Sequence, residues 1–334
     1  MIRARYYKKD EAGVKCLLCP HACMIKQGES GKCRARKNID GELYSLAYGN
    51  PCAVHIDPIE KKPLNHFLPA TNSLSIATAG CNLSCLNCQN WQISQSSPDD
   101  FTDTRMMPDE IVHLADQRAC ASIAYTYTDP TIYYEYMADT AKLARIKGIR
   151  NVMVSAGYIL KAPLQELCHF IDAANIDLKS FSNELYQSLN GASLKPVLQT
   201  LKALNDSDVW LEITNLIIPG YTDDKTMIQQ MCQWLVDNGF ENVPLHFSRF
   251  SPTYRLLDAK TTPVSTLDQV YELAKKAGLN YVYIGNVPGH AAQHTYCHQC
   301  ASKLIDRAGY YMSEIHIAEG KCEYCNTVIP GVWQ

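Results

Sequence analysis

Three cysteines stand close together in the stretch TAGCNLSCLNCQNW, residues 78–91, where Cys81, Cys85 and Cys88 have the spacing C-x3-C-x2-C. Thiolates so close in sequence are typical metal ligands. A structural zinc ion takes four ligands in a closed tetrahedron, and a disulfide takes two cysteines. A local set of three therefore indicates a metal centre with one open coordination position. A zinc site completed by a distant residue is the alternative.

Eight further cysteines form two more groups. The spacing C-x2-C-x3-C-x9-C near the start of the chain is not that of paired zinc knuckles, so we expect either a second [4Fe–4S] cluster or structural zinc there. The spacing C-x2-C-x21-C-x2-C is typical of a zinc ribbon, with a rubredoxin-like iron as the alternative. The two groups are Cys16, Cys19, Cys23 and Cys33, and Cys297, Cys300, Cys322 and Cys325.

Composition places the chain among globular proteins, since 46% of its 334 residues are hydrophobic and 19% are charged. It has no apolar run of about 18 residues, so we expect no membrane span. The first residues, MIRARYYKKDEAGVK, lack the apolar core of a secretory signal, which predicts a cytoplasmic protein. Disulfides rarely persist in that compartment, so the clustered cysteines point to metals.

The charge of the chain is uneven. Residues 1–37 hold ten Lys and Arg against three acidic residues, a net charge of +7, although the whole chain has −3. A basic arm can bind nucleic acid. We favour instead compensation of nearby thiolates, or docking on an acidic partner.

Short apolar runs alternate with helical patterns from residue 73 onward. The runs predict strands at 73–79, 121–127, 151–156, 173–179, 209–218, 243–248 and 280–285, and the patterns predict helices at 108–118, 131–147, 163–170, 193–205, 224–238 and 266–277. This alternation predicts a parallel sheet with helices outside, an α/β fold forming a partial or near-complete (β/α) TIM-type barrel. We expect a four-cysteine module at 1–50, a linker loop at 51–72, the barrel at 73–290, and a zinc-ribbon-like module at 291–334.

Barrel active sites lie at the carboxyl ends of the strands. Polar or cysteine residues stand at or just beyond each predicted strand end, and we expect them to form one site. In chain order they are Cys81, Cys85 and Cys88; Asp129; Ser155 and Gly157; Asp177 and Lys179; Glu212, Thr214 and Asn215; His246 and Arg249; and Asn286.

A C-x3-C-x2-C loop after the first strand of such a barrel resembles the radical S-adenosylmethionine (SAM) superfamily. Across 73–290 the chain is similar to glycyl-radical-enzyme activases of the pyruvate formate-lyase activating-enzyme type. Its closer resemblance, over nearly the whole chain, is to the AmmeMemoRadiSam-system radical SAM enzyme. The segments that carry it are IDPIEKKPLNHF, CQNWQIS, YTYTDPTIYYEY, NIDLKSF and PGVW.

This resemblance implies a [4Fe–4S] cluster on Cys81, Cys85 and Cys88, whose fourth iron chelates SAM. It implies that Asp129 binds the SAM amino group, although Glu is usual there. Among the remaining residues implied to bind cofactor, Asp177 and Lys179 contact SAM, and His246 lies near its ribose and methionine groups. The adenine-packing aromatic is missing because Asn87 precedes the last cysteine, and Trp91 is a candidate replacement. A plain ion pair is the alternative for Asp177 with Lys179, and a core histidine for His246.

We therefore expect a radical SAM enzyme that abstracts hydrogen from an unidentified substrate. It would take electrons from a low-potential donor of the flavodoxin or ferredoxin type. An activase acting on a glycine of a partner protein is one alternative, and a non-catalytic metal-binding adaptor contacting RNA or protein is another. The resemblance suggests AMMECR-like and Memo-like partners by association. The absence of G-x-G-x-x-G and Walker motifs speaks against a dinucleotide or nucleotide-triphosphate enzyme.

Overall fold

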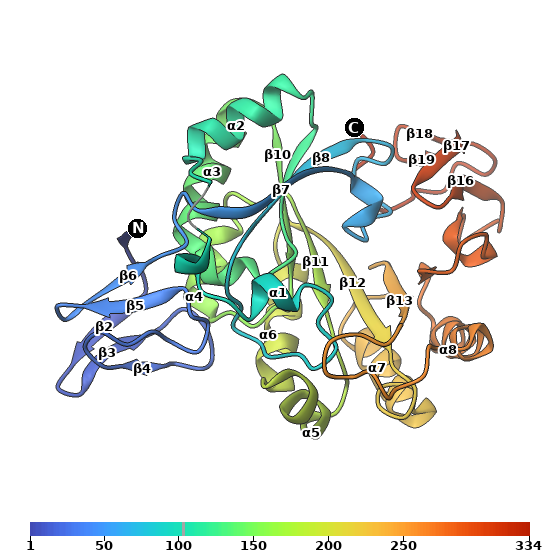
Figure 1. Cartoon of the computed structure of the whole chain (residues 1–334). Helices are drawn as coiled ribbons and strands as arrows, with labels where there is room; N and C mark the ends of the chain where they lie inside the picture. Colours follow the sequence, from blue (N-terminus) through green and yellow to red (C-terminus); the bar gives the residue numbers. More distant parts are fainter. Residues whose placement is uncertain (102–103) are drawn as a thin grey trace.

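A computed structural model describes residues 1–101 and 104–334. Its centre is one eight-stranded sheet in the order β14-β13-β12-β11-β10-β9-β8-β7, visible in Figure 1. Strands β8 to β14 run parallel to one another, which confirms the parallel sheet predicted from the sequence. The strands are β7 (Pro51–Pro58), β8 (Asn72–Thr78), β9 (Ser122–Tyr125), β10 (Arg150–Ser155), β11 (Ala173–Asp177), β12 (Trp210–Ile217), β13 (Leu245–Arg249) and β14 (Val282–Gly285).

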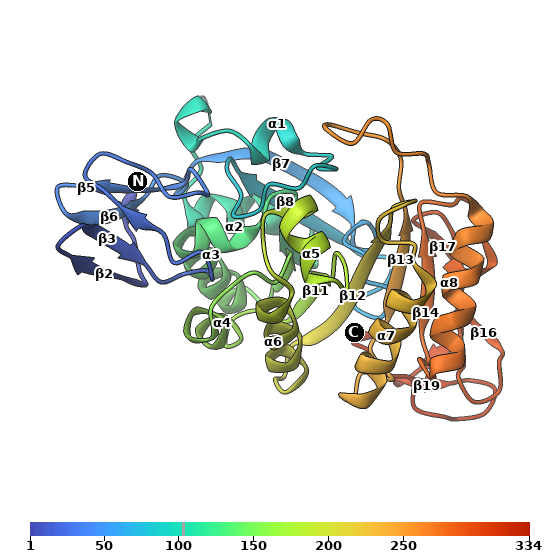
Figure 2. The same cartoon turned by 90° about the horizontal axis from the view of Figure 1, so that it is seen from below.

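Helices connect the parallel strands and cover the outer face of the sheet (Figure 2). Helix α7 begins where the side chain of Asp224 accepts a hydrogen bond from the amide of Met227, and α8 ends at Gly278 with φ of 106°. These local signals explain why the predicted helices are found. The main helices are α2 (Pro108–Gln117), α3 (Tyr134–Ile146), α4 (Lys161–Leu167), α6 (Leu194–Asn205), α7 (Lys225–Asp237) and α8 (Val264–Ala277).

The sheet is open rather than closed. Within the described residues, its edge strands β7 and β14 are each hydrogen-bonded on one side, so of the predicted partial or near-complete barrel the parallel sheet with its helices is confirmed and closure is not shown. The segment 51–72 is also not simply a loop, because β7 pairs antiparallel with β8. Pro51 and Pro58 hid this strand in the sequence, and an edge strand tolerates proline because one side needs no ladder hydrogen bonds.

Two small modules lie at opposite ends of the sheet (Figures 1 and 2). The first contains two three-stranded sheets and the second a three-stranded sheet with a short hairpin. The N-terminal strands are β1 (Ile2–Arg3), β2 (Tyr7–Asp10), β3 (Gly13–Cys16), β4 (Met24–Ile25), β5 (Arg36–Ile39) and β6 (Glu42–Ser45). The C-terminal strands are β15 (Thr295–Tyr296), β16 (Lys303–Ala308), β17 (Tyr311–Ile315), β18 (Ile317–Ala318) and β19 (Lys321–Cys322).

Shorter helical elements fill the connections: α1 (Trp91–Ser94), α5 (Asn183–Leu185), the 3-10 turns Ile59–Lys61, Pro98–Asp100, Pro130–Tyr133 and Ala291–Gln293, and a π turn at Tyr186–Asn190. In the described part of the chain, none of the helices combines the length and apolar character needed to cross a membrane.

Buried polar contacts fix both modules to the sheet domain. In the N-terminal module, Arg36 forms a bidentate ion pair with Glu135 of α3 at 3.0 and 3.1 Å, and both side chains are 1% exposed. In the C-terminal module, the Arg307 guanidinium donates to the carbonyl of Asn65 at 2.8 Å. A buried guanidinium group without acceptors destabilises the folded state. These contacts therefore hold each module in a defined position against the sheet domain.

Candidate active site

A cavity of about 790 Å³ opens at the carboxyl ends of the parallel strands. Its wall contains residues that lie within or just beyond β8, β9, β10, β11, β13 and β14, as the sequence predicted. The predicted residues of β12 do not line it. There Thr214 donates to the side chain of Asn175 at 2.9 Å, and Asn215 donates to the carbonyl of Leu178 at 2.6 Å, so both are structural.

The three cysteines Cys81, Cys85 and Cys88 all line this cavity. Local donors already point at their sulfurs: the amide of Leu83 lies 3.5 Å from the Cys81 Sγ, and the Asn190 Nδ2 lies 3.2 Å from the Cys85 Sγ. Burial raises the pKa of the Cys81 thiol, and it also raises that of Cys85. A buried thiolate needs a positive partner, which a bound metal centre supplies.

The three sulfurs are not gathered as closely as those around a single ion. Thiolates at about 2.3 Å from one tetrahedral zinc ion lie about 3.8 Å apart. Cys81, Cys85 and Cys88 are not among the described groups whose ligand atoms all lie within 4.8 Å of one another. Each cysteine of a cubane cluster binds a different iron, so its sulfurs are spread more widely than around one ion. The donor set therefore fits an iron–sulfur cluster.

Asp129 lies in the cavity wall with its carboxylate largely occupied by the protein. Its Oδ1 accepts from the amide of Thr131 at 2.9 Å, and its Oδ2 accepts from the Ser155 hydroxyl at 3.0 Å and the Ala156 amide at 2.9 Å. A carboxylate has about four acceptor positions, so one remains. Asp129 thus joins the end of β9 to the end of β10 and positions Ser155 in the wall.

Gly157 does not line the cavity, unlike Ser155. Its φ is +66°, and a Cβ there would lie 2.9 Å from the Ile176 side chain, so only glycine fits this turn without strain. Its amide donates to the Ser155 hydroxyl at 3.0 Å. Gly157 therefore positions the Ser155 side chain and does not itself contact the cavity.

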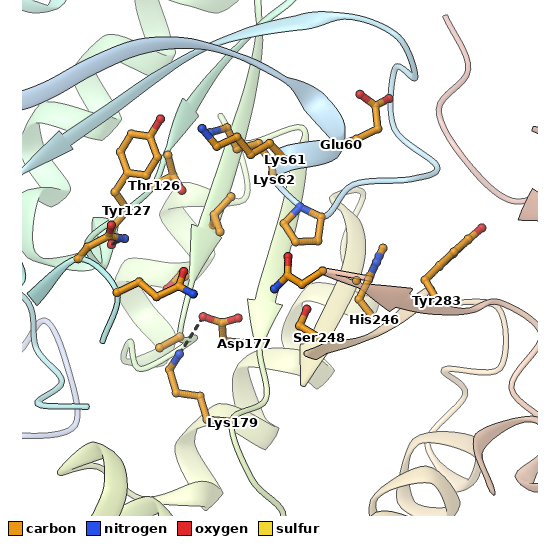
Figure 3. A pocket seen from close by; sticks show the side chains of 18 of the residues that line it. Glu60, Lys61, Lys62, Thr126, Tyr127, Asp177, Lys179, His246, Ser248 and Tyr283 are labelled. Carbon is orange, nitrogen blue, oxygen red and sulfur yellow. Dashed lines mark hydrogen bonds and ion pairs between the residues drawn. The ribbon is translucent and has the colours of Figure 1, made fainter. Parts of the chain in front are cut away.

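Asp177 and Lys179, from the end of β11, face the cavity as an ion pair with an Nζ–Oδ2 distance of 2.9 Å. Figure 3 shows the ammonium of Lys179 directed at the Asp177 carboxylate. The side chains remain 36% and 26% exposed, respectively, so both charges are accessible to a ligand. Arg249, by contrast, does not line the cavity, and its Nε donates to the carbonyl of Thr262 at 2.9 Å.

His246 lines the cavity and contacts a buried carboxylate behind it. Its Nε2 lies 2.6 Å from the Oε2 of Glu212, which is 0% exposed, and its ring stacks on Tyr283 at 5.1 Å between centroids. Burial of Glu212 opposes ionisation, but its hydrogen bonds with His246 and the Asn65 amide, together with the nearby His246 and His66 rings, outweigh burial and lower the pKa of Glu212. Nε2 is therefore the donor to Glu212, and Nδ1 takes no part in that contact.

Sequence reasoning missed the wall formed by the segment after β7. Asp57 accepts hydrogen bonds from Lys61 at 2.7 Å, Lys62 at 2.6 Å and the Tyr127 hydroxyl. Lys61 and Lys62 line the cavity (Figure 3), and burial lowers the pKa of Lys62 to about 8. In the sequence, the stretch IDPIEKKP carries the family resemblance, and its adjacent lysines are the signal for this wall.

The far end of the cavity was also missed, because it includes the C-terminal module. Glu60, Gln293 and Arg307 line it, together with Tyr310. Three atoms in this group, Glu60 Oε2, Gln293 Oε1 and Arg307 Nε, are buried and have no hydrogen-bond partner among the described residues. Such orphan groups are unusual in a folded protein and mark a place for a polar ligand or water.

Trp91, the predicted adenine-packing residue, lies outside the cavity. Its ring stacks on Tyr254 at 5.1 Å and an interplanar angle of 11°, and it is 40% exposed. The structure therefore gives Trp91 a different partner.

The four C-terminal cysteines form a compact group. The Sγ atoms of Cys297 and Cys325 lie 3.6 Å apart, and those of Cys300 and Cys322 lie 3.8 Å apart. Within residues 1–101 and 104–334, this is the one group of at least three potential ligands with every ligand atom within 4.8 Å of the others. These distances match four thiolates around one tetrahedral ion.

The four N-terminal cysteines surround a separate small pocket, beside the loop that holds Cys81. This pocket also contains Arg36, His21 and Asn82. Both outer cysteine groups predicted from the sequence thus converge in space, each within its own module.

The fold and the three cysteines at the cavity agree with the comparison to known protein families. The model of the radical SAM superfamily matches residues 75–235, from β8 to within α7. The chain therefore contains a radical SAM domain, and this family implies a [4Fe–4S] cluster and SAM.

An uncharacterized protein of Methanocaldococcus jannaschii is 46% identical over 332 residues, which cover 98% of this chain and 99% of that protein. The pyruvate formate-lyase 1-activating enzyme of Escherichia coli K12 is 21% identical over 215 residues, covering 60% of this chain and 87% of the enzyme. The radical SAM domain is therefore homologous to these activating enzymes.

Among solved structures, SuiB of Streptococcus suis bound to SAM superposes with a TM-score of 0.52 at 12% identity. The match covers 68% of this chain and 53% of SuiB. A radical SAM methyltransferase of Sphaerobacter thermophilus gives a TM-score of 0.51 at 12% identity, covering 69% of this chain and 70% of that protein. At this identity the likeness concerns the fold.

Proposed function

We propose that the protein is a radical SAM enzyme that abstracts hydrogen from a polar substrate held in the 790 Å³ cavity. The observation that carries this proposal is the convergence of Cys81, Cys85 and Cys88 with the polar strand ends on one cavity. A cluster bound there supplies the electron that splits SAM into methionine and a 5′-deoxyadenosyl radical. The catalytic interpretation is preferred to a non-catalytic adaptor because an adaptor has no need of such a cavity.

The residues of the chain divide the binding of SAM among them. The charges of Asp177 and Lys179 suit polar groups of SAM, and the Lys179 ammonium can pair with the carboxylate of the methionine portion. His246, with Nε2 committed to Glu212, offers Nδ1 as an acceptor to a ribose hydroxyl. Asp129 retains one acceptor position for an ammonium group, and Ser155 lies beside it.

The substrate is placed at the far end, against Glu60, Gln293 and Arg307. These side chains have buried polar atoms without partners in the described chain. A ligand that forms hydrogen bonds with these atoms binds more tightly than one that does not. The cation of Arg307 has no carboxylate within 4.0 Å among the described residues, which favours an anionic or strongly accepting group on the substrate.

An activase that acts on a glycine of a partner protein is the second candidate. The homology to pyruvate formate-lyase activating enzymes favours it. The two candidates differ in the size of the substrate rather than in the chemistry of the cavity. Partners of the AMMECR-like and Memo-like types, a flavodoxin- or ferredoxin-type donor and a cytoplasmic location also belong to this proposal.

The C-terminal quartet is proposed to hold structural zinc, since four thiolates close the coordination shell. The sulfur spacing of 3.6 and 3.8 Å supports this assignment. Its role would be to fix β16, and with it Arg307, at the cavity. The N-terminal quartet is proposed to bind a metal centre of its own.

The test is anaerobic reconstitution with iron and sulfide, followed by reduction with dithionite in the presence of SAM. We expect 5′-deoxyadenosine and methionine in equal amounts from the native chain and from Cys168→Ala, a control outside the three groups. Cys85→Ala should yield neither product. Absence of cleavage by a native chain with a fully assembled cluster would overturn the proposal.

A further inference from the structure

The four N-terminal cysteines come from three parts of the small module and meet at one pocket. Cys16 ends β3, Cys19 and Cys23 lie in the turn between β3 and β4, and Cys33 precedes β5. The turn is closed by a hydrogen bond of 2.9 Å, in which the amide of Cys16 donates to the carbonyl of Cys23. The fold therefore brings four thiol donors to one small pocket.

The spacing of these donors differs from that of the C-terminal quartet. In the described chain, no three of the four N-terminal sulfurs lie within 4.8 Å of one another, whereas all four C-terminal sulfurs do. One zinc ion would draw its thiolates to about 3.8 Å apart. A cubane places one thiolate on each of four irons and requires the wider spread.

A buried cation beside the pocket favours an anionic group, such as a thiolate-ligated cluster, within it. Arg36 is 1% exposed and lines the pocket, and its terminal nitrogens are taken by Glu135 and by the carbonyl of Arg5. Its Nε is buried without a partner among the described residues. An N–H donor left in this position is satisfied by a cluster sulfide or a ligating thiolate, and such hydrogen bonds tune a cluster's potential.

The pocket adjoins the loop that holds the first cysteine set. A Cβ at Gly80, the residue before Cys81, would lie 2.4 Å from the carbonyl oxygen of Cys33. The Nε2 of His21 lies 2.7 Å from the carbonyl oxygen of Asn82, the residue after Cys81. Cys81 is thus flanked on both sides by residues in contact with the N-terminal module, which provides a short covalent and hydrogen-bonded route between the two cysteine sets.

We propose that Cys16, Cys19, Cys23 and Cys33 bind a second, fully cysteine-ligated [4Fe–4S] cluster that relays single electrons to the Cys81 site. A low-potential one-electron donor is oxidised by one electron as this cluster is reduced. The cluster is reoxidised when it passes that electron to the cluster of the cavity, so no other reactant is consumed. The site itself stands independently of the proposed function, and its role as a relay rests on that function.

The site is tested by metal analysis and spectroscopy on the chain with Cys81, Cys85 and Cys88 replaced by Ala. This variant leaves the N-terminal set intact. After anaerobic reconstitution we expect about four iron atoms per chain and, on reduction, a cluster EPR signal that added SAM does not change. Zinc in place of iron at this set, or neither metal, would overturn the proposal, whatever the native chain does with SAM.

The relay is tested in the converse variant, Cys16→Ala with Cys19→Ala, beside Cys168→Ala as the control. The converse variant should keep about four iron atoms and a SAM-sensitive EPR signal. Reduction of its cavity cluster by reduced flavodoxin should slow at least tenfold, whereas dithionite, a small reductant, should still drive SAM cleavage. Unchanged reduction by flavodoxin would refute the relay.

Arg36→Gln offers a second measurement that does not remove a ligand. Loss of the buried cation should lower the reduction potential of the N-terminal cluster, because the more negative reduced form loses its compensation. Exposed Lys8→Gln, which removes a charge from the same module, should leave that potential almost unchanged. Equal potentials in the Arg36→Gln and native proteins would contradict the assignment of the orphan Nε to the cluster.

Discussion

The Nε2 of His246 lies 2.6 Å from the carboxylate of Glu212, and both side chains are almost fully buried. The same carboxylate accepts the backbone amides of Asn65 at 2.9 Å and His66 at 2.7 Å. Glu212 therefore joins a cavity residue on β13 to the wall segment after β7. One buried anion sets both the tautomer of His246 and the position of that wall.

Replacing Glu212 by Gln should weaken SAM binding about tenfold and destabilise the fold by about 1–3 kcal/mol. Gln keeps the size of the side chain, but its NH₂ group faces donors where Glu212 had an acceptor. Calorimetric titration with SAM and urea unfolding measure the two effects. Glu323→Gln, at an exposed carboxylate that pairs with His316, is the control and should alter neither. Native SAM affinity in Glu212→Gln would show that this pair serves folding alone.

Stability should fall as the pH is lowered from 7 toward 5.5, with His66 as one cause. Burial lowers the pKa of His66 to about 4, whereas an unfolded histidine has a pKa of about 6.5. Between these values the unfolded chain binds the proton more readily, so acid favours unfolding. The loss is about 1 kcal/mol at about pH 5.5.

Urea unfolding of His66→Gln at several pH values isolates this effect. The variant is less stable at pH 7 because it loses contacts with Pro330 and Tyr283. Its further loss of stability on acidification should be smaller than that of the native chain. Parallel pH profiles for the two proteins would rule out His66 as the titrating group. His113→Gln, at an exposed helical position, should follow the native profile.

Lys179→Met should weaken SAM binding at least tenfold with little effect on stability. A partly exposed ion pair stabilises a fold by less than about 1 kcal/mol. Its loss should therefore lower the affinity for SAM and leave the free energy of unfolding nearly unchanged. Lys303→Met, which breaks an exposed pair with Asp306, is the matched control. If unfolding shifts while SAM affinity stays native, the pair with Asp177 is structural.

Removal of metal from the C-terminal quartet should loosen the module from residue 291 onward. Cys300→Ser with Cys325→Ser should lower the zinc content by about one ion per chain and raise proteolysis within this module. SAM cleavage without substrate should persist, because the side chains proposed to contact SAM belong to the sheet domain and not to this module. Iron with a visible thiolate absorption in the native quartet would point instead to a rubredoxin-like centre.

The basic N-terminal face should speed reduction by an acidic donor. Lys8, Lys26 and Lys32 are exposed and form no ion pair with the described residues. Charge reversal of all three to Glu should slow reduction by flavodoxin at low salt and flatten its dependence on ionic strength. Reversal of exposed lysines on the helical side, Lys147, Lys195 and Lys225, should have little effect. Equal slowing in both triple variants would remove the case for a docking face.

The sequence predicted the sheet well and the cavity incompletely. The parallel strands were visible because each is a short apolar run, buried on both faces, between helices with clear end signals. Strand β7 was not, because Pro51 and Pro58 interrupt an apolar pattern at an edge. Polar residues after the strands were found because topology alone brings strand ends together.

The rest of the cavity could not be read from local patterns. Arg307 reaches the wall from the C-terminal module and bonds to the carbonyl of Asn65, 242 positions earlier in the chain. Asp57 gathers Lys61, Lys62 and Tyr127 only once β7 is paired with β8. Contacts of such long range depend on the finished fold and have no periodic signature in sequence.

The wall segment at 65–67 is held largely by residues that the ribosome adds more than 200 positions later. His66 contacts Tyr283 and Pro330, and Phe67 forms a bridge with Val332. During synthesis, therefore, the sheet can assemble while this side of the cavity still lacks its supports. We expect iron and sulfide to reach the three cysteines most easily in this interval, before the tail docks against the segment 65–67.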